Sequence, residues 1–211
     1  MKPLLLFSLC LPVGLSAQTV YELPFASQDN TIELAVENTG SLTLDNVTVS
    51  VQNRPDWISF RSNEAIIDQL ESSAEKPVSF TFSIDKTAPV GKEHAITFLI
   101  DGPGGQTWTK TITVRISAPE KFELFQNFPN PFNPTTTISY QLSSPGRVRL
   151  VVYNLLGQEV ATLVDAEREA GFHQELWHAS SLASGLYIYR ITATDKSGDK
   201  IVDNKTMSLV K

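Results

Sequence analysis

The chain has 211 residues, of which 41% are hydrophobic and 19% are charged, and its formal net charge is −6 at pH 7. This composition is typical of a globular protein and excludes a chain that is disordered throughout. The acidic balance and the absence of Lys and Arg runs argue against a nucleic-acid partner, because phosphate binding needs a basic stripe. The length allows one domain or two small ones.

Residues 1–17 have the order of a secretory signal peptide. Lys2 supplies a short positive region, residues 4–11 are mostly apolar, and small residues lead to Ala17. This order predicts export with cleavage after Ala17, and the segment is too short to serve as a permanent membrane span. Cys10 is the only cysteine, and the Phe7-Ser8-Leu9 that precedes it is a poor lipobox. We therefore expect a mature chain without disulfides, thiolate chemistry or lipid attachment.

Short β-rich runs separated by turn residues follow the signal peptide, without helical periodicity. In several runs apolar and polar residues alternate, as in Val78-Ser79-Phe80-Thr81-Phe82, which predicts strands with one buried face and one wet face. The glycine-rich turn at 101–105 predicts a hairpin between its flanking runs. The expected strands of the first half are 31–37, 47–52, 57–61, 66–70, 78–84, 95–101 and 107–116.

A linker at 117–121 precedes a second set of runs. Each turn between them contains Gly, Asn, Asp or Ser, and the turn at 195–198 predicts another hairpin. The expected strands are 136–142, 147–153, 159–164, 171–178, 186–194 and 200–210. We therefore predict an all-β protein with two tandem Ig-like antiparallel β-sandwiches, at 19–118 and 119–211, each with about seven strands.

The most unusual segment is Phe128-Pro129-Asn130-Pro131-Phe132-Asn133-Pro134-Thr135. Its prolines cannot donate to a β-ladder and favour polyproline II geometry. We expect Phe128 and Phe132 to pack down while the prolines hold the chain extended along a sheet edge. Such a segment would cap the edge and discourage edge-to-edge aggregation.

The second half, from about 122 to 211, resembles the type A C-terminal sorting domain of the type IX secretion system of Bacteroidetes, and also the Ig-like domain of the flagellar hook-capping protein. Four elements carry the resemblance in order: the proline-rich segment, Val151-Val152-Tyr153-Asn154-Leu155-Leu156-Gly157-Gln158-Glu159-Val160, Leu182-Ala183-Ser184-Gly185-Leu186-Tyr187-Ile188-Tyr189-Arg190-Ile191, and the basic end Met207-Ser208-Leu209-Val210-Lys211.

The resemblance implies export to the periplasm followed by recognition of the folded tail by the type IX machinery at the outer membrane. In many family members a surface peptidase then removes the tail and links the cargo to lipopolysaccharide. The residues that match the recurrent sorting elements are Pro129, Asn130, Pro131, Phe132, Gly157, Gly185, Tyr187 and Lys211. Each also has an ordinary structural interpretation, as a turn, strand or solvated residue.

The first half resembles, more loosely, bacterial Ig-like domains found beside carbohydrate-active modules, in the pattern Leu34-Ala35-Val36-Glu37-Asn38-Thr39-Gly40 and in Pro55-Asp56-Trp57-Ile58. Such domains serve as spacers or interaction modules, and the fold alone does not fix their function. We expect Trp57 to lie in the core, and Trp108, after a hairpin turn, is the candidate ligand-binding residue.

Known catalytic and metal-binding motifs are absent from the sequence, so we expect no enzyme activity, cofactor or metal site. Oxygen-rich residues at Asp195, Asp199 and Asp203 leave Ca²⁺ as a minor alternative to a solvated hairpin.

The predicted function is that of a secreted or cell-surface non-enzymatic protein that reaches the outside through the periplasm. Its predicted partner is the type IX machinery. We expect the mature protein to have no transmembrane segment. Two alternatives stay open: a surface module that binds a glycan or a protein, and an extracellular or flagellar-type scaffold. The cleavable signal peptide counts against the flagellar role, and an exposed aromatic row beside Trp108 would favour the binding module.

Overall fold

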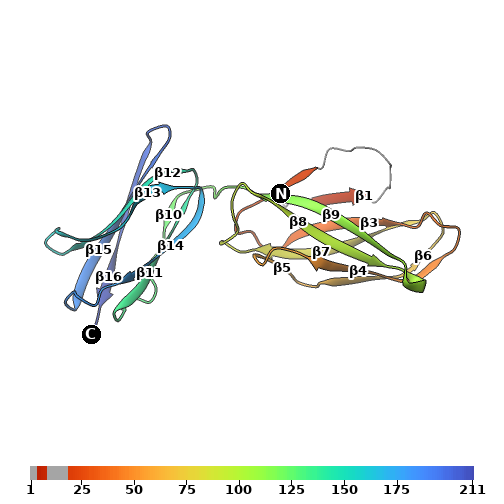
Figure 1. Ribbon diagram of the computed structural model, residues 1–211, viewed down its shortest axis with the longest axis horizontal. Coiled ribbons are helices and arrows are strands. Elements are labelled where there is room, and N and C mark those ends of the chain that lie inside the picture. The colour runs from red at the N-terminus through yellow and green to blue at the C-terminus, as the bar shows by residue number, and fades with distance from the viewer. Residues whose placement is uncertain (1–3, 9–18) are drawn as a thin grey trace. The chain divides into compact units, whose positions relative to one another are not determined.

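The computed structural model describes residues 4–8 and 19–211, and it divides into two compact units, Met1–Ser117 and Ala118–Lys211. Each unit consists of two β-sheets that face each other across an apolar core (Figure 1). The prediction of an all-β protein built of antiparallel sandwiches is therefore confirmed. Among the described residues, no helix is long and apolar enough to cross a membrane.

In the first unit, one sheet has the strand order β1-β3-β7-β5 and the other β2-β9-β8-β4-β6. Its strands are β1 (Leu4–Ser8), β2 (Val20–Leu23), β3 (Asn30–Glu37), β4 (Leu44–Asn53), β5 (Ile58–Phe60), β6 (Glu64–Leu70), β7 (Glu75–Ile84), β8 (Glu93–Asp101) and β9 (Thr107–Ile116), with a short 3₁₀ turn, η1 (Pro103–Gly105). The sequence patterns predicted β3 to β9 but not β2, which is only four residues long and ends before Pro24.

The predicted signal peptide and its cleavage site lie mostly outside the described residues. Of residues 1–17, only the five of β1 are described, and they pair in parallel with β3.

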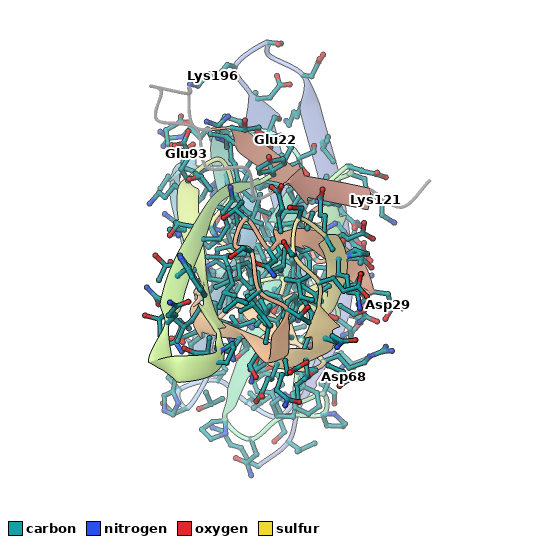
Figure 2. All side chains as sticks on the ribbon, turned by 90° about the vertical axis from the view of Figure 1, so that its right-hand side faces the viewer. Glu22, Asp29, Asp68, Glu93, Lys121 and Lys196 are labelled. Atoms are coloured by element: carbon teal, nitrogen blue, oxygen red, sulfur yellow. The ribbon has the colours of Figure 1, made fainter. Side chains whose placement is uncertain are left out.

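The core of the first unit follows the alternation seen in the sequence. Phe80 and Phe82 of β7 face Phe98 of β8, with ring centroids of Phe80 and Phe98 5.2 Å apart. Trp57 precedes β5, is partly buried and packs against this core, with its ring edge-to-face to His94 at 5.0 Å. Charged side chains stay outside: the carboxylates of Glu22, Asp29, Asp68 and Glu93 are exposed around the apolar interior (Figure 2).

In the second unit, a sheet of order β10-β11-β14 faces one of order β13-β12-β15-β16. The strands are β10 (Glu123–Leu124), β11 (Thr135–Leu142), β12 (Gly146–Asn154), β13 (Glu159–Arg168), β14 (Gly171–His178), β15 (Gly185–Asp195) and β16 (Lys200–Leu209). The predicted hairpins at 101–105 and 195–198 join β8 to β9 and β15 to β16. Tyr140 and Tyr189 are the largest fully buried side chains of this core.

Gly146 opens the central strand β12, where two neighbours pair with it. It lies opposite Arg168 of β13 and Asp195 of β15. A Cβ atom at this position would lie 2.9 Å from the Cα of Asp195 and would overlap the carbonyl oxygen of Thr194. Because both obstacles are backbone atoms, only a residue without a side chain lets β15 approach β12 this closely.

We expect Gly146→Ala to lower the free energy of unfolding of the second unit by about 2–3 kcal/mol or more, because the added methyl group forces two central strands apart. Hydrogen exchange, followed by mass spectrometry on peptides from residues 146–154, measures this loss. Ser144→Ala, in the exposed turn just before β12, is the matched control and should change the value by less than about 0.5 kcal/mol. Equal protection in both variants would contradict the proposed close packing.

Candidate functional site

The proline-rich segment 128–134 connects the two sheets of the second unit. Phe128 forms an antiparallel bridge with Thr137 of β11, through two backbone hydrogen bonds of 2.9 Å. Four residues later, Phe132 forms a parallel bridge with Leu209 of β16. The segment therefore leaves one sheet and joins the other, bending on the way, whereas the sequence predicted an extended run along one edge.

The same segment pairs with the free side of the edge strand β16 at the C-terminal end of that strand. The N–H of Phe132 donates to the carbonyl oxygen of Ser208 at 2.9 Å, and the N–H of Val210 donates to the carbonyl oxygen of Phe132 at 3.0 Å. The side-chain oxygen of Asn130 accepts from the N–H of Ser208 at 3.0 Å. Edge capping was expected from the prolines, and it is carried out by the residues beside them.

The two phenylalanines of the segment differ in burial. Phe132 is 1% exposed and packs on Trp177, with ring centroids 5.6 Å apart. Phe128 is 80% exposed, so the prediction that it packs down is wrong. The reason is the bridge to Thr137: it fixes the backbone of Phe128 on the rim of the sheet, with its side chain on the outer face.

A buried polar network holds the start of the segment. The side-chain amide of Asn127 donates to the carbonyl oxygen of Pro129 at 3.0 Å and to the hydroxyl of Thr136 at 2.9 Å. The hydroxyl of Tyr189 accepts from the N–H of Asn127 and donates to the carbonyl oxygen of Phe125, both at 2.9 Å. Burial raises the pKa of the Tyr189 hydroxyl to about 12, so it remains a neutral donor at physiological pH.

Sequence reasoning missed this network, although its members bracket the motif that it identified. Asn127 and Thr136 are 2% and 1% exposed. A signal was present, because polar residues that flank a proline-rich segment must satisfy donors and acceptors that proline leaves unpaired. The partner on β15 could not be assigned, since it lies 62 residues further along the chain from Asn127.

Tyr187 joins the same end of the unit through an aromatic cluster. Its ring meets Trp177 edge-to-face at 6.1 Å, and its hydroxyl donates to the carbonyl oxygen of Ala183 at 2.8 Å. Gly185, with φ +157°, opens β15 opposite Leu209. The predicted sorting residue Tyr187 thus also has a core role, since it is only 7% exposed.

Gly157 and Lys211 are the remaining predicted sorting residues. Gly157 has φ +76° in the turn between β12 and β13, where the side-chain oxygen of Asn154 accepts from the N–H groups of Leu156 and Gln158, both at 3.0 Å. The Lys211 amine donates to the carbonyl oxygen of Ser180 at 2.9 Å.

The strand register brings all of these residues to one end of the second unit. Asn154 lies opposite Tyr187, and Gly185 lies opposite Leu209, so the β12–β13 turn, the start of β15 and the end of β16 are adjacent. The loop before β15 is tied to the proline-rich segment by the N–H of Ala179, which donates to the carbonyl oxygen of Pro134. The predicted sorting residues at this end are Pro129, Asn130, Pro131, Phe132, Gly157, Gly185, Tyr187 and Lys211.

This end also exposes apolar side chains, which we call the apolar tip: Leu155, Leu156, Leu186 and Val210. Leu155 and Leu156, at the β12–β13 turn, are 67% and 83% exposed. Adjacent exposed leucines in a turn contribute nothing to the core, and such groupings mark contact surfaces.

Trp108 lies in the first unit, at the start of β9, and is 40% exposed. It lines a cleft formed by the loop between β3 and β4 and by the turn that contains η1. Within the described part of the first unit, the other exposed large apolar side chains are Leu42 and Ile66. The aromatic row that would have favoured a surface module for a glycan is therefore not found among those residues.

The oxygen-rich turn at 195–199 is held by its own backbone. The Asp195 carboxylate accepts from the N–H groups of Ser197 and Asp199, both at 2.9 Å. Among residues 4–8 and 19–211, no group of three His, Cys, Asp or Glu side chains is placed to hold a metal ion.

A comparison with known protein families identifies the family of the second unit. Residues 126–204 match the family model of the secretion system C-terminal sorting domain. The second unit therefore carries a secretion system sorting domain. It is the sorting domain of the type IX system, and a chain that carries it is a secreted or cell-surface protein that interacts with the type IX machinery.

No curated protein matches the chain in sequence. Among solved structures, latent PorU from Porphyromonas gingivalis matches 93% of this chain at 14% identity and a TM-score of 0.36, and the chain spans 19% of PorU. CBD12 from CALX1.2 matches 87% at 10% identity, with 78% of its own length covered and a TM-score of 0.38. The E. coli chaperone DraB matches 97% at 13% identity, with 100% of its length covered and a TM-score of 0.31.

We expect Tyr189→Phe to lower the free energy of unfolding of the second unit by about 1–3 kcal/mol, because it leaves the buried N–H of Asn127 without its acceptor. Hydrogen exchange of peptides from residues 185–209 measures the change. Tyr153→Phe is the matched control, since its ring lies under the guanidinium of Arg190 at 4.8 Å and phenylalanine keeps that contact. The same loss in both variants would mean that the Tyr189 hydroxyl does not hold the segment.

Proposed function

We propose that this protein is a non-enzymatic β-sandwich exported by a signal peptide and delivered across the outer membrane by its second unit. The first unit, residues 19–117, is then the cargo, and the second unit is the part that the type IX machinery recognises. The observation that carries the proposal is the gathering of the predicted sorting residues at one end of the second unit, around a segment that connects its two sheets.

The apolar tip supports a specific mode of recognition. The backbone beneath it is rigid, because the side chain of Asn154 fixes the β12–β13 turn and Phe132 fixes the end of β16. Preorganised apolar side chains bind a partner without the entropic cost of ordering a loop. We assign the tip as the contact surface for a machinery component with a complementary apolar surface.

A binding role for the first unit is the second candidate function. The cleft beside Trp108 favours it over the role of a plain spacer, because a spacer needs no concave apolar surface. Export by the second unit is compatible with either role.

Deletion of residues 120–211 tests the main proposal in the native host. We expect the truncated protein to accumulate in the periplasm, while the full chain reaches the cell surface or the medium, because the truncated form lacks every sorting residue named above. Cell fractionation with immunoblotting measures the distribution. The deletion begins within the linker, so the described strands of the first unit are left intact. Normal external levels of the truncated protein would refute sorting by the second unit.

Substitution of the tip tests the recognition surface without removing the domain. We expect Leu155→Ser with Leu156→Ser to reduce external protein by about tenfold, because loss of two buried leucines at an interface weakens binding by at least that factor. The matched control is Ile201→Ser with Val202→Ser, at the opposite end of the same sheet, with side chains 44% and 50% exposed.

Both double variants should retain the unfolding transition of the wild type, and immunoblots of each fraction measure the export. If the tip variant is exported as well as the control, recognition uses another surface.

A further inference from the structure

A cleft of about 620 Å³ opens at one end of the first sandwich. Its floor consists of aliphatic core side chains: Val36, Val47, Leu70 and Ile100, all of which are at most 4% exposed to solvent. One wall is the loop at 38–43, and the other is the turn that contains η1. The volume lies within the range of small-molecule pockets, about 300–1,000 Å³.

Hydrogen bonds hold both walls of the cleft in place. The side-chain amide of Asn38 donates to the carbonyl oxygens of Leu42, Leu70 and Glu71 at 2.8, 3.0 and 3.1 Å, and its oxygen accepts from the N–H of Gly40 at 3.0 Å. Across the cleft, the N–H of Gly102 donates to the carbonyl oxygen of Gln106 at 2.8 Å and closes the turn.

The rim carries Leu42 and Trp108, two of the three large apolar side chains that the described part of the first unit exposes. Leu42 is 75% exposed at the tip of its loop. The Trp108 ring lies against Gly102, where a Cβ would come within 3.0 Å of its Cζ3 atom, so one wall fixes the ring position. The exposed apolar surface of the unit is thus concentrated around an apolar floor.

The floor of the cleft is aliphatic, and its lining disfavours anionic ligands. The donors of the Asn38 amide are taken up by backbone carbonyls, so the polar side chains left to contact a ligand are those of the walls: Thr39, Ser41, Thr43 and Gln106. Glu37 is the one ionisable side chain among the described residues that line the cleft. Residues 19–117 carry thirteen Asp and Glu against seven Lys and Arg, and labelled carboxylates of this unit lie at its surface (Figure 2). This field repels an anion.

We propose that this cleft binds a small, uncharged, apolar molecule, with Leu42 and Trp108 closing over a ligand that rests on the aliphatic floor. The inference deepens the second candidate function, in which the first unit is the exported binding part. An uncharged ring or chain gains most here, since it covers apolar surface on both sides without a charge to desolvate.

The test uses the purified full chain and N-phenyl-1-naphthylamine, an uncharged apolar dye whose fluorescence rises on leaving water. We expect saturable binding at one site per chain. The anionic dye 1-anilinonaphthalene-8-sulfonate should bind more weakly, by a factor that shrinks as salt is added. Maltohexaose, an uncharged oligosaccharide, should not displace the first dye.

Variants locate the site. Leu42→Ser and Trp108→Ala should each weaken dye binding by about tenfold. Ile66→Ser is the matched control, because Ile66 is 59% exposed on β6 and does not line the cleft, and it should leave binding unchanged. Loss of binding in Leu42→Ser would not result from misfolding, because this exposed loop side chain can be removed without loss of the core.

The proposal is overturned if the dye does not bind saturably, if Leu42→Ser binds it as tightly as Ile66→Ser, or if maltohexaose displaces it. Equal affinity for the anionic dye at low salt would also overturn the assignment of an uncharged ligand. Export is measured by fractionation and dye binding by fluorescence on the purified chain. If the chain is exported but binds no dye, only this inference is rejected. If it binds the dye but is not exported, only the proposed sorting function is rejected.

Discussion

The second unit depends on the proline-rich segment 128–134, whose backbone is hydrogen-bonded to a strand of each of its two sheets. Phe128 is paired to β11 and Phe132 to β16, so five residues lead from one sheet to the other. Proline suits the intervening positions because it has no N–H to leave unsatisfied there. The network of Asn127, Thr136 and Tyr189 then fixes where the span begins.

The same segment also covers part of the exposed edge of the larger sheet. β16 is an edge strand, and unpaired edges invite pairing with other chains. Asn130 and Phe132 use the polar groups of Ser208 and Val210 that such a pairing would need. Pairing of these groups within the domain leaves fewer free donors and acceptors for edge-to-edge aggregation.

This end of the second unit has both a hydrogen-bonded backbone and exposed apolar side chains. The side-chain oxygen of Asn154 accepts two backbone hydrogen bonds within the β12–β13 turn, whereas Leu155 and Leu156 of the same turn project into solvent. A rigid frame with apolar side chains on its surface is suited to recognition, since the partner gains apolar contact without ordering the loop. The first unit repeats this design at its cleft, where Asn38 fixes the loop that presents Leu42.

The all-β class, nearly every long strand and both hairpins could be predicted from the sequence alone, because period-two alternation and turn residues are local signals. The sorting family was predicted from the resemblance of four motifs in order. Sequence reasoning located the unusual segment but placed Phe128 in the core and assumed an extended path. Three features are visible only in the folded structure: which aromatic is buried, which residues of β15 and β16 contact the segment, and that Trp108 borders a cleft. The contacts of the segment with β15 and β16 join residues 62 and 78 positions apart in the chain, Asn127 with Tyr189 and Asn130 with Ser208, and no local pattern encodes them.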